Sequence, residues 1–242
     1  DLEEWSEPIL CFDAPVDFWG ENNFWAPEVH RYKGKFYLLG SFNAKGHNRA
    51  TQALVAEQPQ GPYRVVGEPL TPTDWMCLDG TLYIEDDVPY LVFCHEWLQV
   101  EDGEIAYIPL KEDLSGIAGE ATVLFSASES GWAHPLKVDE YQGIVTDGPW
   151  LVKEDDELIM FWSSYHNGTY AVGMSVSESG KIEGPWRHLE ELLFDKNGGH
   201  GMMFKSFDGK TYFVLHGPND HPEERAQFYE ITKGKEGYCL VK

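Results

Sequence analysis

Residues 144–189 read IVTDGPWLVKEDDELIMFWSSYHNGTYAVGMSVSESGKIEGPWRHL, and this stretch shows the structural unit of the chain most clearly. Apolar and aromatic runs of strand length alternate with turns rich in Gly, Asn and Asp, a pattern typical of an antiparallel meander. The longest predicted strands cover residues 158–163 and 170–176. A sheet of this kind needs other sheets to cover its faces.

The same unit recurs along the chain. Aromatic strands begin near residues 36, 90, 158 and 212, at intervals suited to four-stranded units. A short motif precedes each of them: Ala26-Pro27-Glu28, Leu78-Asp79-Gly80, Asp147-Gly148-Pro149 and Gly199-His200-Gly201. Four-stranded sheets arranged radially make a β-propeller, and the first strand of each blade lines the central channel. We therefore expect the four motifs to converge near one axis.

The sequence predicts one all-β propeller domain over residues 1–242, with about four blades. The blades are expected at 24–66, 75–124, 144–189 and 198–242. Residues 1–23 are interpreted as the remnant of a preceding blade, with an outer strand at 6–10. Either the propeller has four blades, or it is a larger one whose first blade is missing from the chain. A missing blade would expose sheet faces and edges, which predicts a compensating homo-oligomer or a distorted ring.

Composition limits the classes of partner. The formal net charge of −23 argues against nucleic acid or an anionic membrane as a partner. No apolar run approaches the roughly 20 residues of a membrane span, and no signal peptide is visible. The four cysteines match no zinc spacing and are interpreted as structural thiols, which slightly favours a reducing compartment such as the cytoplasm.

The ordered motifs resemble those of glycoside hydrolase family 43, the five-bladed propeller enzymes that act on arabinans and xylans. The resemblance covers essentially the whole chain. It implies removal of arabinofuranosyl or xylosyl residues from plant cell-wall oligosaccharides, with inversion and without a required cofactor. Three carboxylates are implied: a general acid, a general base and one that sets the pKa of the acid. An inverting acid and base stand about 6.5–9.5 Å apart, which leaves room for a water molecule.

Two aspartates match positions of that carboxylate set. Asp79 matches the pKa-modulating aspartate, and Asp147 falls at the general-acid position, where the family usually has Glu-Gly-Pro. Asp is shorter by one methylene, so the reach of this acid would change. Each residue also fits a simple turn Asp before glycine.

The resemblance also concerns His200, which matches a histidine that points into the channel near a bound ion or water. It therefore implies calcium or another ion beside His200 and makes this residue a candidate metal ligand. The sequence offers no spaced set of further histidines to complete such a site.

The general base has no counterpart in the sequence. The family carries it as an Asp on the inner strand of the first blade, whereas Asp13 and Asp17 here lie in a loop without that context. An alternative function is therefore a propeller that binds sugar without hydrolysing it, or an inactive fragment. A scaffold for protein contacts is a third class, which the convergent Asp and His motifs disfavour.

Seven residues are candidates for contacts with a sugar. Aromatic faces stack on sugar rings, although core contacts explain most aromatic side chains. Glu96 is either a carboxylate of the cleft or an exposed loop residue, and Arg225 is a candidate clamp for a hydroxyl or carboxylate. The full set is Trp25, Trp75, His95, Glu96, Trp162, His200 and Arg225.

Overall fold

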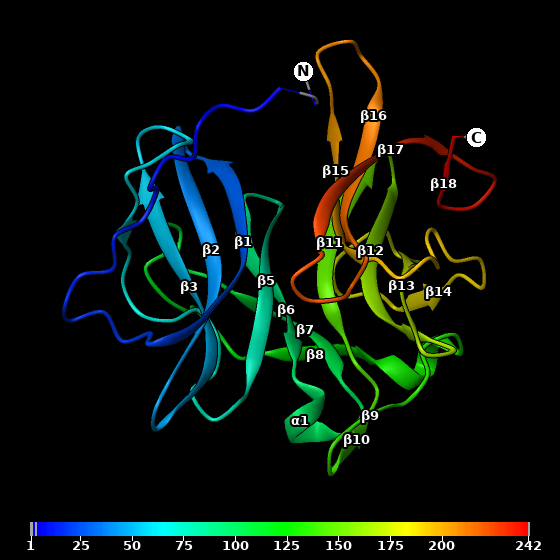
Figure 1. The fold of residues 1–242 in the computed structure, drawn as a ribbon, viewed down its shortest axis with the longest axis horizontal. Coiled ribbons are helices and arrows are strands. Elements are labelled where there is room, and N and C mark those ends of the chain that lie inside the picture. The colour runs from blue at the N-terminus through cyan, green and yellow to red at the C-terminus, as the bar shows by residue number, and fades with distance from the viewer. Residues whose placement is uncertain (1, 3, 242) are drawn as a thin grey trace.

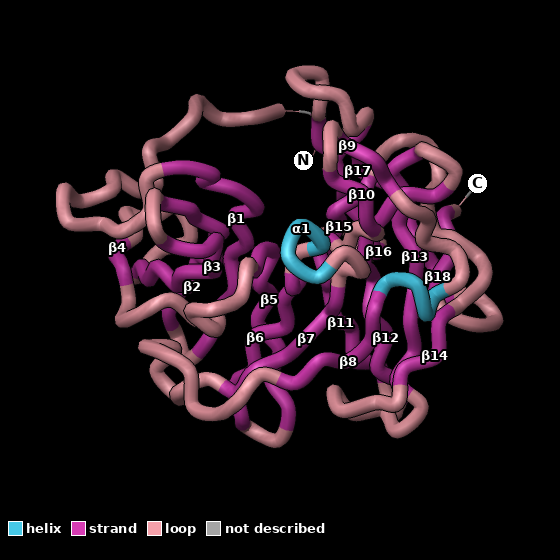
Figure 2. The backbone as a smooth tube through the Cα atoms, turned by 90° about the horizontal axis from the view of Figure 1, so that it is seen from below, coloured by secondary structure: helices cyan, strands magenta, loops and turns pink. Residues whose placement is uncertain are grey.

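Four antiparallel sheets of four strands each stand around a common axis in the computed structural model, which describes residues 2 and 4–241 (Figures 1 and 2). The strands of every sheet follow chain order from the axis outward. The first sheet holds β1 (Asn22–Tyr32), β2 (Lys35–Ala44), β3 (His47–Ala56) and β4 (Arg64–Val65), and the second holds β5 (Cys77–Glu85), β6 (Val88–His95), β7 (Glu104–Pro109) and β8 (Thr122–Ser126). The third holds β11 (Asp147–Glu154), β12 (Glu157–His166), β13 (Thr169–Ser177) and β14 (Trp186–His188), and the fourth holds β15 (Gly199–Lys205), β16 (Thr211–Gly217), β17 (Arg225–Lys233) and β18 (Tyr238–Leu240). The predicted all-β propeller with about four blades is confirmed.

In the part of the chain that the structure describes, helical structure is confined to two single turns, α1 (Trp97–Val100) and the 3₁₀ turn Ala127–Ser130. A short hairpin of β9 (Leu136–Val138) and β10 (Tyr141–Gly143) projects beside α1 (Figure 1). No helix within the described residues has the length and apolar character needed to cross a membrane.

The inner strand of each sheet (β1, β5, β11 and β15) carries a β-bulge toward its N-terminal end. The strand register shifts between Trp25 and Glu28, Leu78 and Thr81, Asp147 and Trp150, and Gly199 and Met202. One residue of every bulge has a left-handed backbone, with φ of 48° at Ala26, 58° at Asp79, 49° at Gly148 and 51° at His200. A bulge bends the strand and redirects its side chains, so the four motifs turn toward the axis at equivalent positions.

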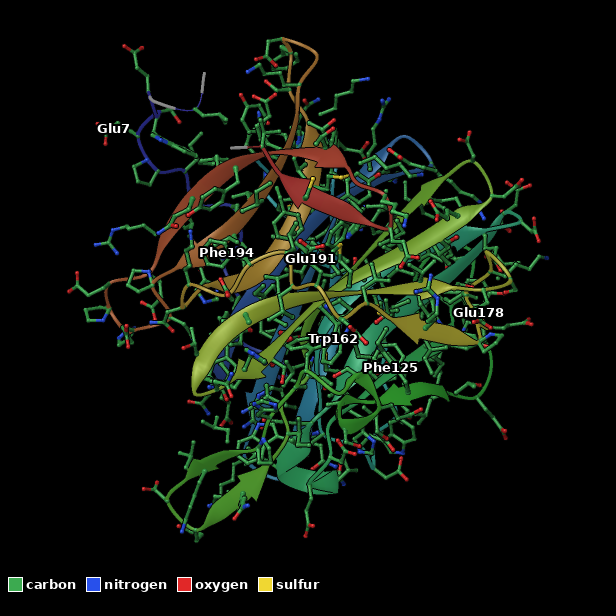
Figure 3. The ribbon with its side chains drawn as sticks, turned by 90° about the vertical axis from the view of Figure 1, so that its right-hand side faces the viewer. Glu7, Phe125, Trp162, Glu178, Glu191 and Phe194 are labelled. Atoms are coloured by element: carbon green, nitrogen blue, oxygen red, sulfur yellow. The ribbon has the colours of Figure 1, made fainter. Side chains whose placement is uncertain are left out.

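Neighbouring sheets are held together by apolar side chains between their faces. Leu39 and Phe93 belong to the core between the first two sheets, and Phe161 and Phe213 to the core between the last two. Between the second and third sheets, the rings of Phe125 and the fully buried Trp162 lie 5.6 Å apart (Figure 3). Phe93, Phe161, Trp162 and Phe213 come from the aromatic strands that the repeat predicted, whereas Phe125 lies in β8, just beyond the blade expected at 75–124.

The segment before β1 contains no strand among residues 4–21, so the predicted outer strand at 6–10 is wrong. Pro8 has no N–H to donate to a ladder, and the side chains at 6–10 are exposed. The ring of Trp5 instead lies 6.2 Å from that of Phe228 in β17, so the segment runs from the first sheet to the last (Figure 1). Positions 1 and 3 of the proposed blade remnant lie outside the described residues.

Residues 11–19 cover the face of the first sheet that has no neighbouring sheet. Phe12, Phe18 and Trp19 pack against a cluster that includes the buried Leu38 and Phe42. Part of the surface that a missing blade would expose is thus buried by the chain itself. A homo-oligomer that covers the rest stays a prediction.

Two glycines of the third sheet allow a test of the close approach between Gly148 and the His200 ring at the axis. A Cβ on Gly148 (φ +49°) would lie 2.6 Å from the His200 ring, whereas one on Gly168 (φ +78°) would meet no atom within 4 Å. We expect Gly168→Ala to cost about 1 kcal/mol of unfolding free energy from backbone strain alone, and Gly148→Ala about 2–4 kcal/mol. Denaturant unfolding of both variants measures the difference, and equal losses would contradict the close contact.

Candidate active site

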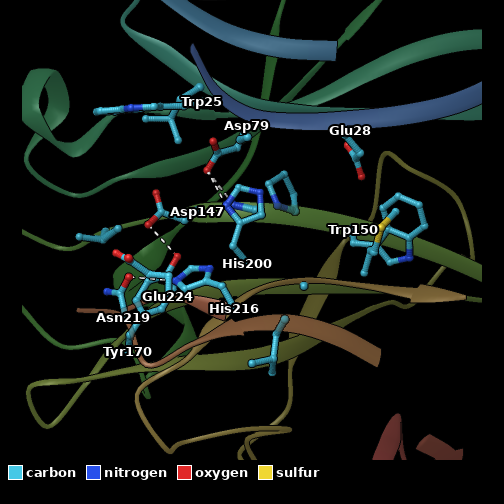
Figure 4. A pocket seen from close by; sticks show the side chains of 18 of the residues that line it. Trp25, Glu28, Asp79, Asp147, Trp150, Tyr170, His200, His216, Asn219 and Glu224 are labelled. Carbon is cyan, nitrogen blue, oxygen red and sulfur yellow. Dashed lines mark hydrogen bonds and ion pairs between the residues drawn. The ribbon is translucent and has the colours of Figure 1, made fainter. Parts of the chain in front are cut away.

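A cleft of about 900 Å³ opens at the axis, and residues from all four inner strands line it (Figure 4). The bulges supply Trp25 and Ala26 from β1, Asp79 from β5, Asp147 and Gly148 from β11, and His200 and Gly201 from β15. The sequence-based expectation that the four motifs converge is met. Further residues that line the cleft come from β13, from the loop between β16 and β17, and from α1 and the β9–β10 hairpin.

Asp79 makes polar contacts with each of the three other sheets. Its backbone N–H donates to Ser41 Oγ at 2.9 Å, and its Oδ2 accepts the N–H of Gly148 at 3.0 Å. The same oxygen lies 3.5 Å from Nδ1 of His200. Only 8% of Asp79 is exposed. The bulge thus aims a nearly buried carboxylate at the bulges of the next two sheets.

Asp147 is held from within its own sheet. The hydroxyl of Tyr170 on β13 donates to Asp147 Oδ2 at 2.9 Å. The Tyr170 ring stacks on His216 at 5.5 Å, and Nε2 of His216 lies 2.9 Å from Asn219 Oδ1. Asn219 in turn donates to the hydroxyl of Tyr165 at 3.0 Å. This network orients one oxygen of Asp147.

Both aspartates hold protons unusually well. Burial raises the pKa of Asp79 to about 7, against the effect of the Gly148 N–H, and the charges of Glu96 and Glu28 raise it further. Burial also raises the pKa of Asp147 to about 7, with Asp79 as the next cause, while His200 and Tyr170 act in the opposite direction. The charge of Asp79 thus favours the protonated form of Asp147, which can carry a proton near neutral pH. A carboxyl with such a pKa suits general acid catalysis.

His200 lies between these carboxylates and Glu28 (Figure 4). Its backbone N–H donates to Ser163 Oγ at 2.8 Å, and desolvation lowers the pKa of its imidazole despite the nearby charges of Asp147 and Glu28. No cluster of three or more His, Cys, Asp or Glu residues in the described part of the chain is arranged to hold a metal ion. A metal-binding role of His200 stays a prediction.

The other predicted contact residues divide into two groups. Trp25, Glu96 and Arg225 line the cleft together with His200. Glu96 is only 5% exposed and forms an ion pair with the buried Arg49, so it is not an exposed loop residue. The guanidinium of Arg225 donates to the backbone oxygens of Pro222 and Glu224.

The remaining three lie outside the cleft. Trp75 stacks on His95 at 4.1 Å, and His95 is buried and contacts Glu104 and Gln99. Trp162 is fully buried and donates to Ser175 Oγ. None of these three side chains is among the described residues that line the cleft, and their predicted contact with a sugar stays untested.

Sequence reasoning missed several residues that line the cleft. The sequence pattern places Tyr170 only at the start of a strand, and it gives Glu28 no role beyond the motif Ala26-Pro27-Glu28, yet both line the cleft. Glu224 lies in the loop before β17 and points toward the region where Asp147 and Tyr170 meet (Figure 4). Its spacing from the inner-strand motifs gave no signal. Asp13 and Asp17, the loop carboxylates considered as bases, are exposed and do not line the cleft.

Comparison with known proteins identifies a family match and several relatives of this chain. Residues 1–234 match the family described as Glycosyl hydrolases family 43. The endo-arabinase from Bacteroides thetaiotaomicron VPI-5482 is 41% identical, with a TM-score of 0.90 over 93% of this chain and 81% of that one. A thermostable family-43 glycoside hydrolase shares the fold, with a TM-score of 0.86 at 20% identity over 100% of this chain and 82% of that one.

A curated relative is the extracellular exo-alpha-(1->5)-L-arabinofuranosidase ArbA of Cellvibrio japonicus (strain Ueda107). It is 24% identical in an alignment of 235 positions that covers 81% of this chain and 62% of ArbA. The chain therefore spans less than two thirds of the length of this relative.

Two substitutions are expected to move the pKa of Asp147 in opposite directions. Asp79→Asn removes a negative charge that raises this pKa and should lower it, whereas Tyr170→Phe removes a hydrogen bond that favours the ionised form and should raise it. Carboxyl ¹³C NMR titration of Asp-labelled protein measures both shifts. Tyr229→Phe is the matched control, because the Tyr229 hydroxyl donates to Gln227 Oε1 and Tyr229 does not line the cleft. Shifts of the same sign in the first two variants would refute this electrostatic account.

Proposed function

The chain belongs to glycosyl hydrolases family 43, and we propose that it hydrolyses arabinofuranosyl linkages in plant cell-wall arabino-oligosaccharides. The observation that carries the proposal is the pair of coupled carboxyls, Asp79 and Asp147, at the floor of a cleft large enough for a sugar. The relatives named as endo-arabinase and arabinofuranosidase support arabinose as the sugar. Xylosyl linkages are the second candidate, because a solved structure titled endo-1,4-beta-xylanase, from Bacteroides thetaiotaomicron VPI-5482, is only 24% identical and supports the fold alone.

In this proposal Asp147 donates the proton to the leaving oxygen. Its pKa of about 7 keeps a fraction of the carboxyl protonated at neutral pH, and the Tyr170 hydroxyl orients it. Asp79 acts through its charge and through its hold on the Gly148 backbone beside Asp147. The departing sugar keeps the donated proton, and water supplies the hydroxyl at the anomeric carbon with inversion. No cofactor takes part, and an ion beside His200 would act through its charge.

The third carboxylate of the proposal is Glu224. Its side chain is 32% exposed, so water reaches it, and it points into the cleft from the β16–β17 loop (Figure 4). Its partner, His221, lies 3.7 Å away and is itself largely exposed, so the pair leaves the carboxylate accessible. These properties suit a general base that takes the proton of the attacking water.

Hydrolysis by the wild-type chain and by Asp147→Asn tests the proposal. We expect turnover of linear arabino-oligosaccharides that falls by about 10²–10⁴-fold in Asp147→Asn, with a smaller loss on p-nitrophenyl arabinofuranoside, whose leaving group needs little acid catalysis. Asp13→Asn is the matched control, since Asp13 lies outside the cleft. Calorimetric binding of arabino-oligosaccharides without any hydrolysis would favour the non-catalytic alternative.

Glu224→Gln separates the role of base from that of acid. Loss of a base should lower turnover by about 10²–10⁴-fold on natural and activated substrates alike, and azide should restore it by attacking in place of water. Chromatography of the glycosyl azide and initial rates give the two readouts. A loss confined to natural substrates would show that Glu224 donates the proton, and an unchanged rate would remove it from the mechanism.

A further inference from the structure

Trp25 presents part of its indole to the cleft while a buried cation supports the ring. Trp25 is 48% exposed and lines the cleft. The guanidinium carbon of Arg49, on β3, lies over the ring at 4.5 Å from its centroid. Arg49 is only 7% exposed, so little water screens this contact. A cation over an indole face is among the stronger cation–π arrangements.

The backbone alone does not fix the Trp25 ring. Trp25 stands between two shifts in the register of β1, and its neighbour Ala26 has a left-handed backbone. Regular alternation of side chains is therefore interrupted on both sides of this residue. The orientation of the indole must come from side-chain contacts, and Arg49 provides the charged one.

Arg49 is itself fixed by two neighbours. Its Nη1 forms an ion pair with the buried Glu96, and its Nη2 donates to Asn23 Oδ1 at 3.3 Å. The backbone N–H of Glu96 donates to the oxygen of Met76 at 2.8 Å, which anchors this residue before α1. Because the guanidinium is planar and both of its terminal nitrogens have partners, these two contacts fix its orientation against the face of the indole.

We propose that Arg49 and Glu96 are positioning residues that hold Trp25 as a stacking platform for a furanose or pyranose ring in the cleft. They set affinity for the sugar through Trp25, and they do not touch the reacting atoms. The identity of the ligand rests on the proposed function, whereas the hold on Trp25 rests on the contacts alone. A purely structural ion pair would stabilise the fold without changing the affinity for sugar.

A double-mutant cycle on affinity for arabinotriose distinguishes these roles. Arg49→Met alone would leave Glu96 buried and unpaired, so the double variant Arg49→Met/Glu96→Gln removes both charges. Isothermal titration calorimetry should show an increase in Kd of about tenfold for the double variant. In a Trp25→Ala background the same pair of substitutions should change Kd by less than about twofold. Equal losses in both backgrounds would overturn the proposal.

Kinetics and a spectroscopic probe give further readouts. In the hydrolysis of arabinotriose, the double variant should raise KM by a larger factor than it lowers kcat, and the opposite split would contradict the proposal. Arg187→Met is the matched control, since Arg187 is an ion-paired arginine on β14 outside the cleft. It should leave both parameters unchanged.

If the wild-type chain binds no arabinotriose, the proposed ligand fails while the hold on Trp25 remains testable. The ¹⁹F resonance of 5-fluorotryptophan-labelled Trp25, assigned with Trp25→Phe, should shift in Arg49→Met/Glu96→Gln and stay in place in Arg187→Met. An unmoved resonance in the double variant would overturn the proposal independently of any substrate.

Discussion

The contacts of Asp79 are the constraint on which the cleft depends. Its N–H reaches Ser41 of the first sheet, and its carboxylate reaches Gly148 of the third and faces His200 of the fourth. Asp79, a residue of the second sheet, thereby holds the other three sheets in position relative to one another at the axis. Its left-handed φ of 58° is strained for a side chain with a Cβ, and Asp tolerates this conformation better than most residues. The geometry of the carboxylates and the relative placement of the sheets therefore depend on each other.

The raised pKa values of Asp79 and Asp147 follow first from burial and then from the charges of neighbouring carboxylates. Glu28 and Glu96 both raise the pKa of Asp79, and Asp79 in turn raises that of Asp147. The positive charge of Arg49, which pairs with Glu96 and lies over Trp25, lowers the pKa of Asp79 by less than either glutamate raises it. A chain with a formal charge of −23 thus uses negative potential and burial to keep protons on carboxyls near neutral pH.

The features predicted from sequence were those encoded over short distances. Turn chemistry and strand patterns located the inner strands, and the repeated motifs brought Asp79, Asp147 and His200 to one place. Other features depend on partners far along the chain. Glu96 is buried because Arg49, 47 residues earlier, pairs with it. Trp162 could not be assigned to the cleft or to the core, because a strand pattern does not say which element covers a given face. Glu224 reaches the cleft through the path of a loop, which carries no periodic signal.

The four bulges make one backbone site available four times. The equivalent positions hold Ala26, Asp79, Gly148 and His200. Three of them present a methyl group, a carboxylate and an imidazole, and the glycine presents no side chain. A repeat protein built this way can exchange an axial group by a single substitution, because the local conformation that presents it already exists. Duplication of a blade therefore duplicates a backbone position from which a side chain can reach the cleft, as well as a structural unit. Exchange is constrained where the axial group contacts other sheets, as Asp79 does, and where a Cβ would meet a neighbouring side chain, as at Gly148.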